Sequence, residues 1–151
     1  MADVTDVAAY ILEECGSLST MKLQKLAFYS QAYHLVRTGS ELFPEDFQAW
    51  ANGPVSPALF SRHRKRFVIS RGAFGERNAP SRDEAASIDH VLSRLGEYNG
   101  SQLSDMSHKE APWLNARAGC APDARCSRVI PKSVMKAFYG SPSAASNPVF
   151  S

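Results

Sequence analysis

The chain has no apolar run long enough to cross a membrane, and its first residues are unlike a secretory signal. No stretch approaches the ~18 consecutive apolar residues that a membrane span needs. The first residues, MADVTDVAAYILEECG, carry two aspartates where a secretory signal would carry positive charge. A cytoplasmic location without a membrane partner is therefore expected.

Cysteine is also scarce. The three cysteines, Cys15, Cys120 and Cys126, have no CxxC spacing, and no histidine follows Cys126 at the interval of a zinc finger. We interpret them as reduced thiols, in preference to a zinc site or a disulfide. Cys15 lies on the apolar face of a predicted helix, so it is expected to be a small core residue.

The residue patterns of common metal and catalytic sites are missing as well. The four histidines fall on separate predicted elements, with no HExxH motif and no carboxylate cluster. There is no GxSxG motif or Walker-type loop, and RGAFGER has the wrong glycine spacing for a dinucleotide site. We expect no metal, no cofactor and no catalytic residue, although a hydrolase or transferase with an unrecognised site stays an open alternative. His34 and His63 are expected to be half-buried helix residues with hydrogen-bonding partners.

The composition is that of one folded domain. The chain has 151 residues, of which 44% are hydrophobic and 21% are charged, and these are ordinary globular values. A domain of this length can bury roughly 68–70% of the surface that its unfolded chain exposes. The formal net charge of +2 gives no global argument for a polyanionic partner, so any basic site must be local.

Apolar spacing predicts a mainly α-helical, compact single domain of about five to seven helices. The helix over residues 20–37 is apolar nearly all round, so it is expected at the centre of the domain. The stretch GSELFPEDFQAWANGPVSP carries two glycines and three prolines, and a short β-hairpin is expected near residues 42–55. Residues 1–140 should form the domain, and residues 141–151 a flexible tail. Further helices are predicted near 4–15, 58–68, 82–98, 102–108, 112–117 and 131–139.

The two tryptophans lie in segments with proline or glycine beside them, FQAWANGPVSP and EAPWLNAR. A rigid aromatic on such a backbone loses little entropy on binding, and tryptophan is enriched at interface hot spots. The alternative, equally weighted, is that both tryptophans fill the core between helices. We expect the two segments to lie close together as one partner-binding surface. Its candidate anchors are Trp50, Val55, His108 and Trp113, with Gly53, Pro54 and Pro112 holding the backbone.

The strongest charge feature is the run SRHRKRF at residues 61–67. Such a run is most often a solvated face, but it can also contact phosphates or an acidic protein surface. A protein partner is favoured over nucleic acid, because no recognition helix or aromatic stacking platform accompanies the charges. A small nucleic-acid-binding regulator remains the alternative function. The possible contact residues are Arg62, Arg64, Lys65 and Arg66.

Three segments resemble the hallmark segments of the Panacea domain, also described as the SocA-type antitoxin or phage-associated GepA-like family. The family pattern consists of a KLQKLLYYAQ-type helix, an AWxxGPVxPxLY turn and an LSxxTHxExPW segment. Order and separation fit, and the resemblance spans about residues 4 to 139. Phe60 stands where tyrosine is commoner, and Ser107 where threonine is usual. The segments are MKLQKLAFYSQAYHL (21–35), FQAWANGPVSPALF (47–60) and LSDMSHKEAPWLNAR (103–117).

The resemblance implies a mostly helical antitoxin domain that acts without catalysis. Such a protein neutralises a cognate toxin protein encoded in the same operon, usually by direct binding. The SocA-type member instead delivers its toxin to the ClpXP protease, so this protease is a second expected partner. Nucleic acid is not an expected partner, and a homo-oligomer is compatible with the resemblance.

Overall fold

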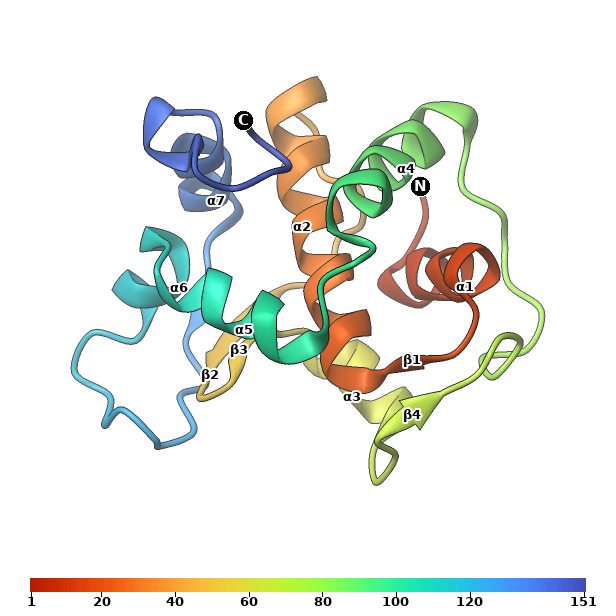
Figure 1. Ribbon diagram of the computed structural model, residues 1–151, viewed down its shortest axis with the longest axis horizontal. Coiled ribbons are helices and arrows are strands. Elements are labelled where there is room, and N and C mark those ends of the chain that lie inside the picture. Colours follow the sequence, from red (N-terminus) through yellow and green to blue (C-terminus); the bar gives the residue numbers. More distant parts are fainter.

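The computed structural model describes residues 1–151, and one long helix, α2 (Thr20–Thr38), runs through its centre (Figure 1). Most of the other helices and the β-hairpin pack against α2. The predicted mainly helical domain with a small β part is confirmed. No helix combines the length and the apolar character that a membrane span requires. The other helices are α1 (Val4–Cys15), α3 (Pro57–His63), α4 (Arg82–Leu95), α5 (Gly100–His108), α6 (Ala111–Ala116), α7 (Lys132–Tyr139) and the 3-10 turn η1 (Pro142–Ala144).

The ends of α2 are set by a capping serine and a glycine. Ser19 Oγ accepts a hydrogen bond from the Lys22 amide at 3.1 Å, which satisfies a free donor of the first turn. Gly39 ends the helix in the left-handed conformation with φ of 81°, a backbone state that favours glycine. Between these ends every residue from Leu23 to Ala32 is buried. The predicted central helix is confirmed, and its polar side chains must therefore find partners inside the protein.

Two buried glutamines of α2 hold the irregular segment that follows the helix. Gln24 Oε1 accepts from the Ser56 amide at 2.8 Å, and Gln24 Nε2 donates to the Ser56 carbonyl at 3.2 Å. Two turns later, Gln31 Nε2 donates to the Phe43 carbonyl at 2.7 Å, and its Oε1 accepts from the Leu42 amide at 2.6 Å. These amides supply partners to buried backbone groups that have none in a helix or sheet. The chain from 42 to 56 is thereby fixed along α2.

A buried carboxylate connects α2 to the C-terminal part of the chain. Glu110 Oε1 accepts from the hydroxyls of Tyr29 at 2.6 Å and Tyr139 at 2.7 Å, and Oε2 accepts from Asn147 Nδ2 at 2.8 Å. Burial raises the pKa of Glu110 above its ordinary value, against the lowering effect of the three donors. Burial likewise raises the pKa values of Tyr29 and Tyr139, so both hydroxyls stay protonated and able to donate.

Residues 141–151, which the sequence predicts to be a flexible tail, pack against the core in the structure. Asn147 and Val149 are buried, and the Phe150 ring stacks on Tyr139 with centroids 4.8 Å apart. The prediction rested on the two apolar residues of the segment, Val149 and Phe150. The segment is also held by the hydrogen bond from Asn147 to the distant Glu110, and no local sequence pattern reveals such a partner.

The predicted hairpin near residues 42–55 is present, and a third strand extends it. Trp50 lies opposite Gly53 across the antiparallel turn, and a strand near residue 129 pairs with the outer edge. Residues 18–19 pair separately with residues 68–69. A strand of two residues is too short to show alternating apolar and polar residues. The strands at 18–19, 68–69 and 129–130 were therefore not predicted. The strands are β1 (Leu18–Ser19), β2 (Phe47–Trp50), β3 (Gly53–Val55), β4 (Val68–Ile69) and β5 (Val129–Ile130).

Two local predictions were wrong. The helix expected over residues 58–68 is shorter, because α3 ends at His63 and the chain turns through Lys65 with φ of 69°. Phe67, which the predicted helix would include, lies beyond α3 and is 89% exposed. Cys15 is exposed as well, because the buried stripe of α1 ends at Leu12.

A cavity at the centre of the domain should be costly. We expect Leu26→Ala to reduce the free energy of unfolding by ~2–5 kcal/mol, because Leu26 is fully buried on α2. Leu114→Ala is the matched control, since Leu114 is 47% exposed on α6. Urea denaturation followed by circular dichroism measures both. Equal stabilities of the two variants would contradict the central position of α2.

Candidate protein-interaction site

The two tryptophan segments meet, as expected from the sequence. Trp113 Nε1 donates a hydrogen bond to the Trp50 carbonyl at 2.8 Å. On its other side, Trp113 stacks against the His108 ring, with centroids 4.0 Å apart and planes 17° apart. Trp113 is 8% exposed, so it supports the hairpin from inside the protein.

Trp50 has a different environment and stays half-buried. Its Nε1 donates to Gln48 Oε1 at 2.8 Å, and its ring meets Phe60 edge-on at 5.0 Å between centroids. The Arg125 guanidinium lies over the indole, 3.9 Å from its centroid. Trp113 therefore fills the core, whereas Trp50 keeps an accessible part of its ring.

The hairpin backbone lies very close to α2 and α5. Gly53 adopts φ of +114°, and a Cβ atom there would lie 2.5 Å from Lys25 Cε and 3.0 Å from Ser107 Oγ. The positive φ favours glycine, and any side chain at this position would displace the end of the Lys25 side chain. Ser104 Oγ donates to the Asn52 carbonyl at the turn. Pro54 in β3 and Pro112 in the first turn of α6 are both buried, and Val55 has only a small exposed fraction.

A cavity of about 370 Å³ opens beside the hairpin, between the start of α2, the β2–β3 turn, α3 and the loop that precedes β5. Its apolar walls include Trp50 and Val55 from the predicted surface. The volume is at the lower end of the range for ligand pockets, which suits one or two side chains. Met21, Ala51 and Phe60 complete the apolar walls.

Lys25 lines this cavity from α2 and is the most unusual residue in it. The residue is 1% exposed, and Nζ makes no ion pair within the protein. Because no fully buried side-chain nitrogen lacks a hydrogen-bonding partner, the unpartnered Nζ keeps a small contact with the cavity. Burial lowers the pKa of Lys25 to about 7. Lys25 was not predicted as a site residue, although a lysine in a helix predicted to be buried all round was an available signal.

His63 lies next to Lys25 and is buried. Its Nε2 is 3.0 Å from Gln24 Nε2, so the imidazole accepts the amide proton and is neutral. Burial lowers the pKa of His63, and the charge of Lys25 lowers it further. The expected hydrogen-bonding partners of the core histidines are confirmed, because His34 Nδ1 also lies 2.7 Å from Ser87 Oγ.

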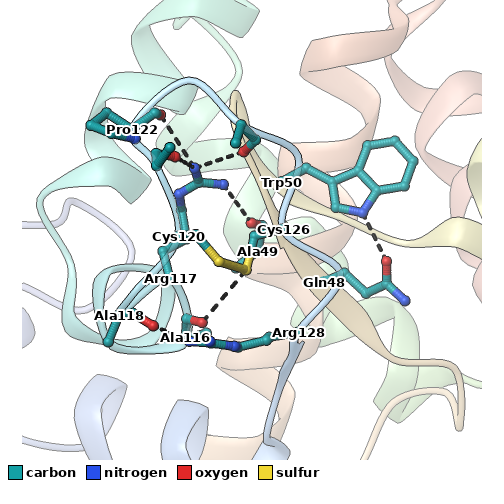
Figure 2. The surroundings of a disulfide bond; sticks show 12 residues. Gln48, Ala49, Trp50, Ala116, Arg117, Ala118, Cys120, Pro122, Cys126 and Arg128 are labelled. Carbon is teal, nitrogen blue, oxygen red and sulfur yellow. Dashed lines mark hydrogen bonds between the residues drawn. A yellow bond between two sulfur atoms is a disulfide. The ribbon is translucent and has the colours of Figure 1, made fainter.

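The loop from residue 117 to 128 carries Arg125 to the cavity, and Figure 2 shows what holds this loop. The structure joins Cys120 and Cys126 in a disulfide, with Cα atoms 6.2 Å apart, which corrects the prediction of reduced thiols. The missing CxxC spacing did not exclude a disulfide, because the buried Arg117 holds the loop in a compact conformation. Its guanidinium donates to the carbonyls of Ala49, Ala121, Pro122 and Ala124.

The basic run predicted as a contact surface is exposed but does not form one helical face. Arg62 lies in the last turn of α3, whereas Arg64, Lys65 and Arg66 follow in the turn toward β4. None of the four makes an ion pair with another residue of the chain. A second hollow, lined by Lys65 and Arg66, shares Thr20, Met21 and Phe60 with the Lys25 cavity. The two hollows are therefore neighbours on the surface.

The uncompensated charge of Lys25 should lower stability in a pH-dependent way. The unfolded chain holds the Lys25 proton up to about pH 10.5, and the folded chain only up to about pH 7. Stability therefore rises as the pH increases from 7 to 10.5, and the full penalty applies below pH 7.

We expect Lys25→Met to be more stable than the parent by ~4 kcal/mol at pH 6, with the difference shrinking toward pH 10. The control is Lys136→Met, since Lys136 is exposed on α7, and its stability should match the parent at every pH. Thermal unfolding at a series of pH values measures this. A Lys25→Met variant less stable than the parent at pH 6 would contradict the description of Lys25 as unpaired.

Comparison with known proteins places the chain in a family. A family model described as "Antitoxin SocA-like, Panacea domain" matches residues 23–114, which include most of α2, the hairpin, α5 and most of α6. Antitoxin SocA of Caulobacter vibrioides (strain NA1000 / CB15N) is 30% identical over 128 residues, covering 74% of this chain and 68% of that protein. No solved structure matches. This chain belongs to the SocA-like antitoxin family of Panacea-domain proteins.

Proposed function

We propose that this protein neutralises a toxin encoded beside it by binding the toxin directly, without catalysis. The proposed surface comprises the β2–β3 hairpin, the Lys25 cavity and the adjoining basic turn. The observation that carries this proposal is the half-buried Trp50, which a rigid hairpin presents at the cavity. The similarity to Antitoxin SocA supports the function.

The rigidity of the hairpin supports a binding role. Pro54 fixes one backbone angle at the start of β3, and the Trp50 carbonyl is held by Trp113. A surface that is already ordered loses less conformational entropy when a partner binds. Rigid aromatic residues beside a pocket are also the usual hot spots of protein interfaces.

Two observations support action without catalysis. Two serine hydroxyls lie near a histidine. Ser87 Oγ is 2.7 Å from His34 Nδ1 but is fully buried. The other is Ser104 Oγ, 3.4 Å from His108 Nε2. That hydroxyl donates its proton to the Asn52 carbonyl, and His108 is held by its stacking on Trp113. This pair therefore lacks the arrangement of a base that activates a nucleophile.

We expect Trp50→Ala to fold like the parent but to lose ~2 kcal/mol or more of binding free energy toward the toxin, about 30-fold in affinity. Calorimetry with the product of the neighbouring gene measures the affinity, and growth during toxin expression measures the rescue. Tyr10→Ala on α1 is the control, because Tyr10 lies outside the proposed surface. A folded Trp50→Ala variant that binds and rescues like the parent would place the toxin elsewhere.

Rescue in a host without ClpXP separates direct inhibition from delivery to the protease. Direct binding predicts that the antitoxin still protects such a host and that the toxin level stays unchanged. Protection that disappears together with the protease would favour an adaptor role instead.

Changing Arg62, Arg64, Lys65 and Arg66 together to serine distinguishes the nucleic-acid alternative. The variant should fold, because all four side chains are exposed. We expect slower association with the toxin at low salt and no specific binding of operon DNA by the parent. A parent that binds this DNA, together with a variant that loses it and still rescues growth, would favour the regulator.

A further inference from the structure

We propose that the Lys25 cavity is a specific site for one acidic side chain of the partner, whose carboxylate pairs with Lys25 Nζ. The inference rests on the proposed function, since the carboxylate comes from the bound toxin. Lys25 would be the buried charge that selects the partner, and the apolar walls of the cavity would take the methylene groups of a glutamate.

The first support is the contrast between Lys25 and the other buried polar side chains. Gln24 and Gln31 use both amide atoms on backbone groups, and Glu110 receives three hydrogen bonds. The Lys25 residue is as deeply buried as these residues, and its Nζ, which touches the cavity, has no partner in the protein. Burying an unpaired charge is costly, so an ammonium kept in this position indicates a ligand that is absent from the free protein.

The second support is the electrostatic character of the surroundings. His63 and His108 both have lowered pKa values, first through burial, with Lys25 as a further contributor. Arg125 is the other cation at the cavity, and Asp123 is the one acidic side chain on its wall. Asp123 is exposed and makes no ion pair with Lys25. The cavity therefore favours an anion and disfavours a cation.

The third support is its shape. The Lys25 ammonium is reached past apolar groups that include Trp50, Val55 and Phe60. A carboxylate on a flexible side chain can enter such a space, with its methylenes against the apolar walls and its oxygens at Nζ. A nucleic-acid phosphate is part of the backbone and has no flexible side chain that could carry it into the cavity. It therefore suits the exposed Arg64 and Arg66 better than Lys25.

Gly53 is a further part of this site. A Cβ atom at position 53 would lie 2.5 Å from Lys25 Cε and 3.3 Å from Nζ, so the glycine leaves room for the lysine under the hairpin. The adjoining hollow with Lys65 and Arg66 continues the positive charge outward. An acidic segment of the partner could thus place one carboxylate in the cavity and further ones along the basic turn.

The pocket can be tested without the toxin. N-acetyl-glutamate methylamide is titrated into the protein, and the Trp50 indole and Lys25 side-chain resonances are followed by NMR. The matched probe is N-acetyl-glutamine methylamide, and the matched variants are Lys25→Met and Lys136→Met. We expect saturable shifts with the glutamate probe in the parent and in Lys136→Met. Binding should be at least tenfold weaker with the glutamine probe or in Lys25→Met.

Three results would overturn the proposal. The first is equal binding of the two probes, and the second is glutamate binding that is unchanged in Lys25→Met. The third is no shift of either resonance at the highest concentration of the glutamate probe. A single-stranded oligonucleotide serves as the phosphate probe. If it bound more tightly than the glutamate probe and depended on Lys25, the ligand would be a nucleic acid and the proposal would be wrong.

The toxin provides the second test. Lys25→Met should weaken its binding at least 30-fold, whereas Lys136→Met should bind like the parent. If the toxin binds the parent and Lys25→Met equally, the carboxylate site is excluded while direct neutralisation stands. If the toxin binds none of the proteins, the proposed function fails, and the glutamate probe still decides whether the cavity binds a carboxylate.

Discussion

The burial of α2 on all sides is the constraint on which the rest of the structure depends. A helix in this position satisfies its own backbone, but its polar side chains cannot reach water and need partners from other segments. Gln24 and Gln31 bind the backbone of the segment leading to the hairpin, and Tyr29 binds Glu110 before α6. The three segments that resemble the family pattern are therefore joined physically through α2. Their polar residues explain why the pattern is more than an apolar stripe.

Lys25 is the exception to this pairing, and the exception lies at the proposed binding surface. Proteins commonly keep groups in binding sites that lower the stability of the free fold, because stability and function make different demands on the same residue. Here the hairpin covers Lys25 through Gly53, and Trp113 fixes the hairpin through the Trp50 carbonyl. In this arrangement the Trp50 ring and the Lys25 ammonium would both contact the same partner at the cavity.

The sequence predicts the features that depend on local patterns. Apolar spacing located α2, and the glycine and proline content of residues 39–57 indicated the hairpin. Features that depend on distant partners were not predictable in this way. The docking of residues 141–151 depends on Glu110 and Tyr139, and the Cys120–Cys126 pair depends on a loop folded around Arg117. The sequence places Lys25 in a helix predicted to be buried on all sides, but only the folded structure shows that its ammonium has no partner.

The most direct test of the unpaired charge on α2 is the pKa of Lys25, measured by NMR in the free protein and in its complex with the toxin. Burial without a partner places this pKa at about 7 in the free protein. A carboxylate at Nζ favours the charged form, so the pKa should rise clearly when the complex forms. A saturated complex in which the pKa of Lys25 stays at its free value would contradict the account.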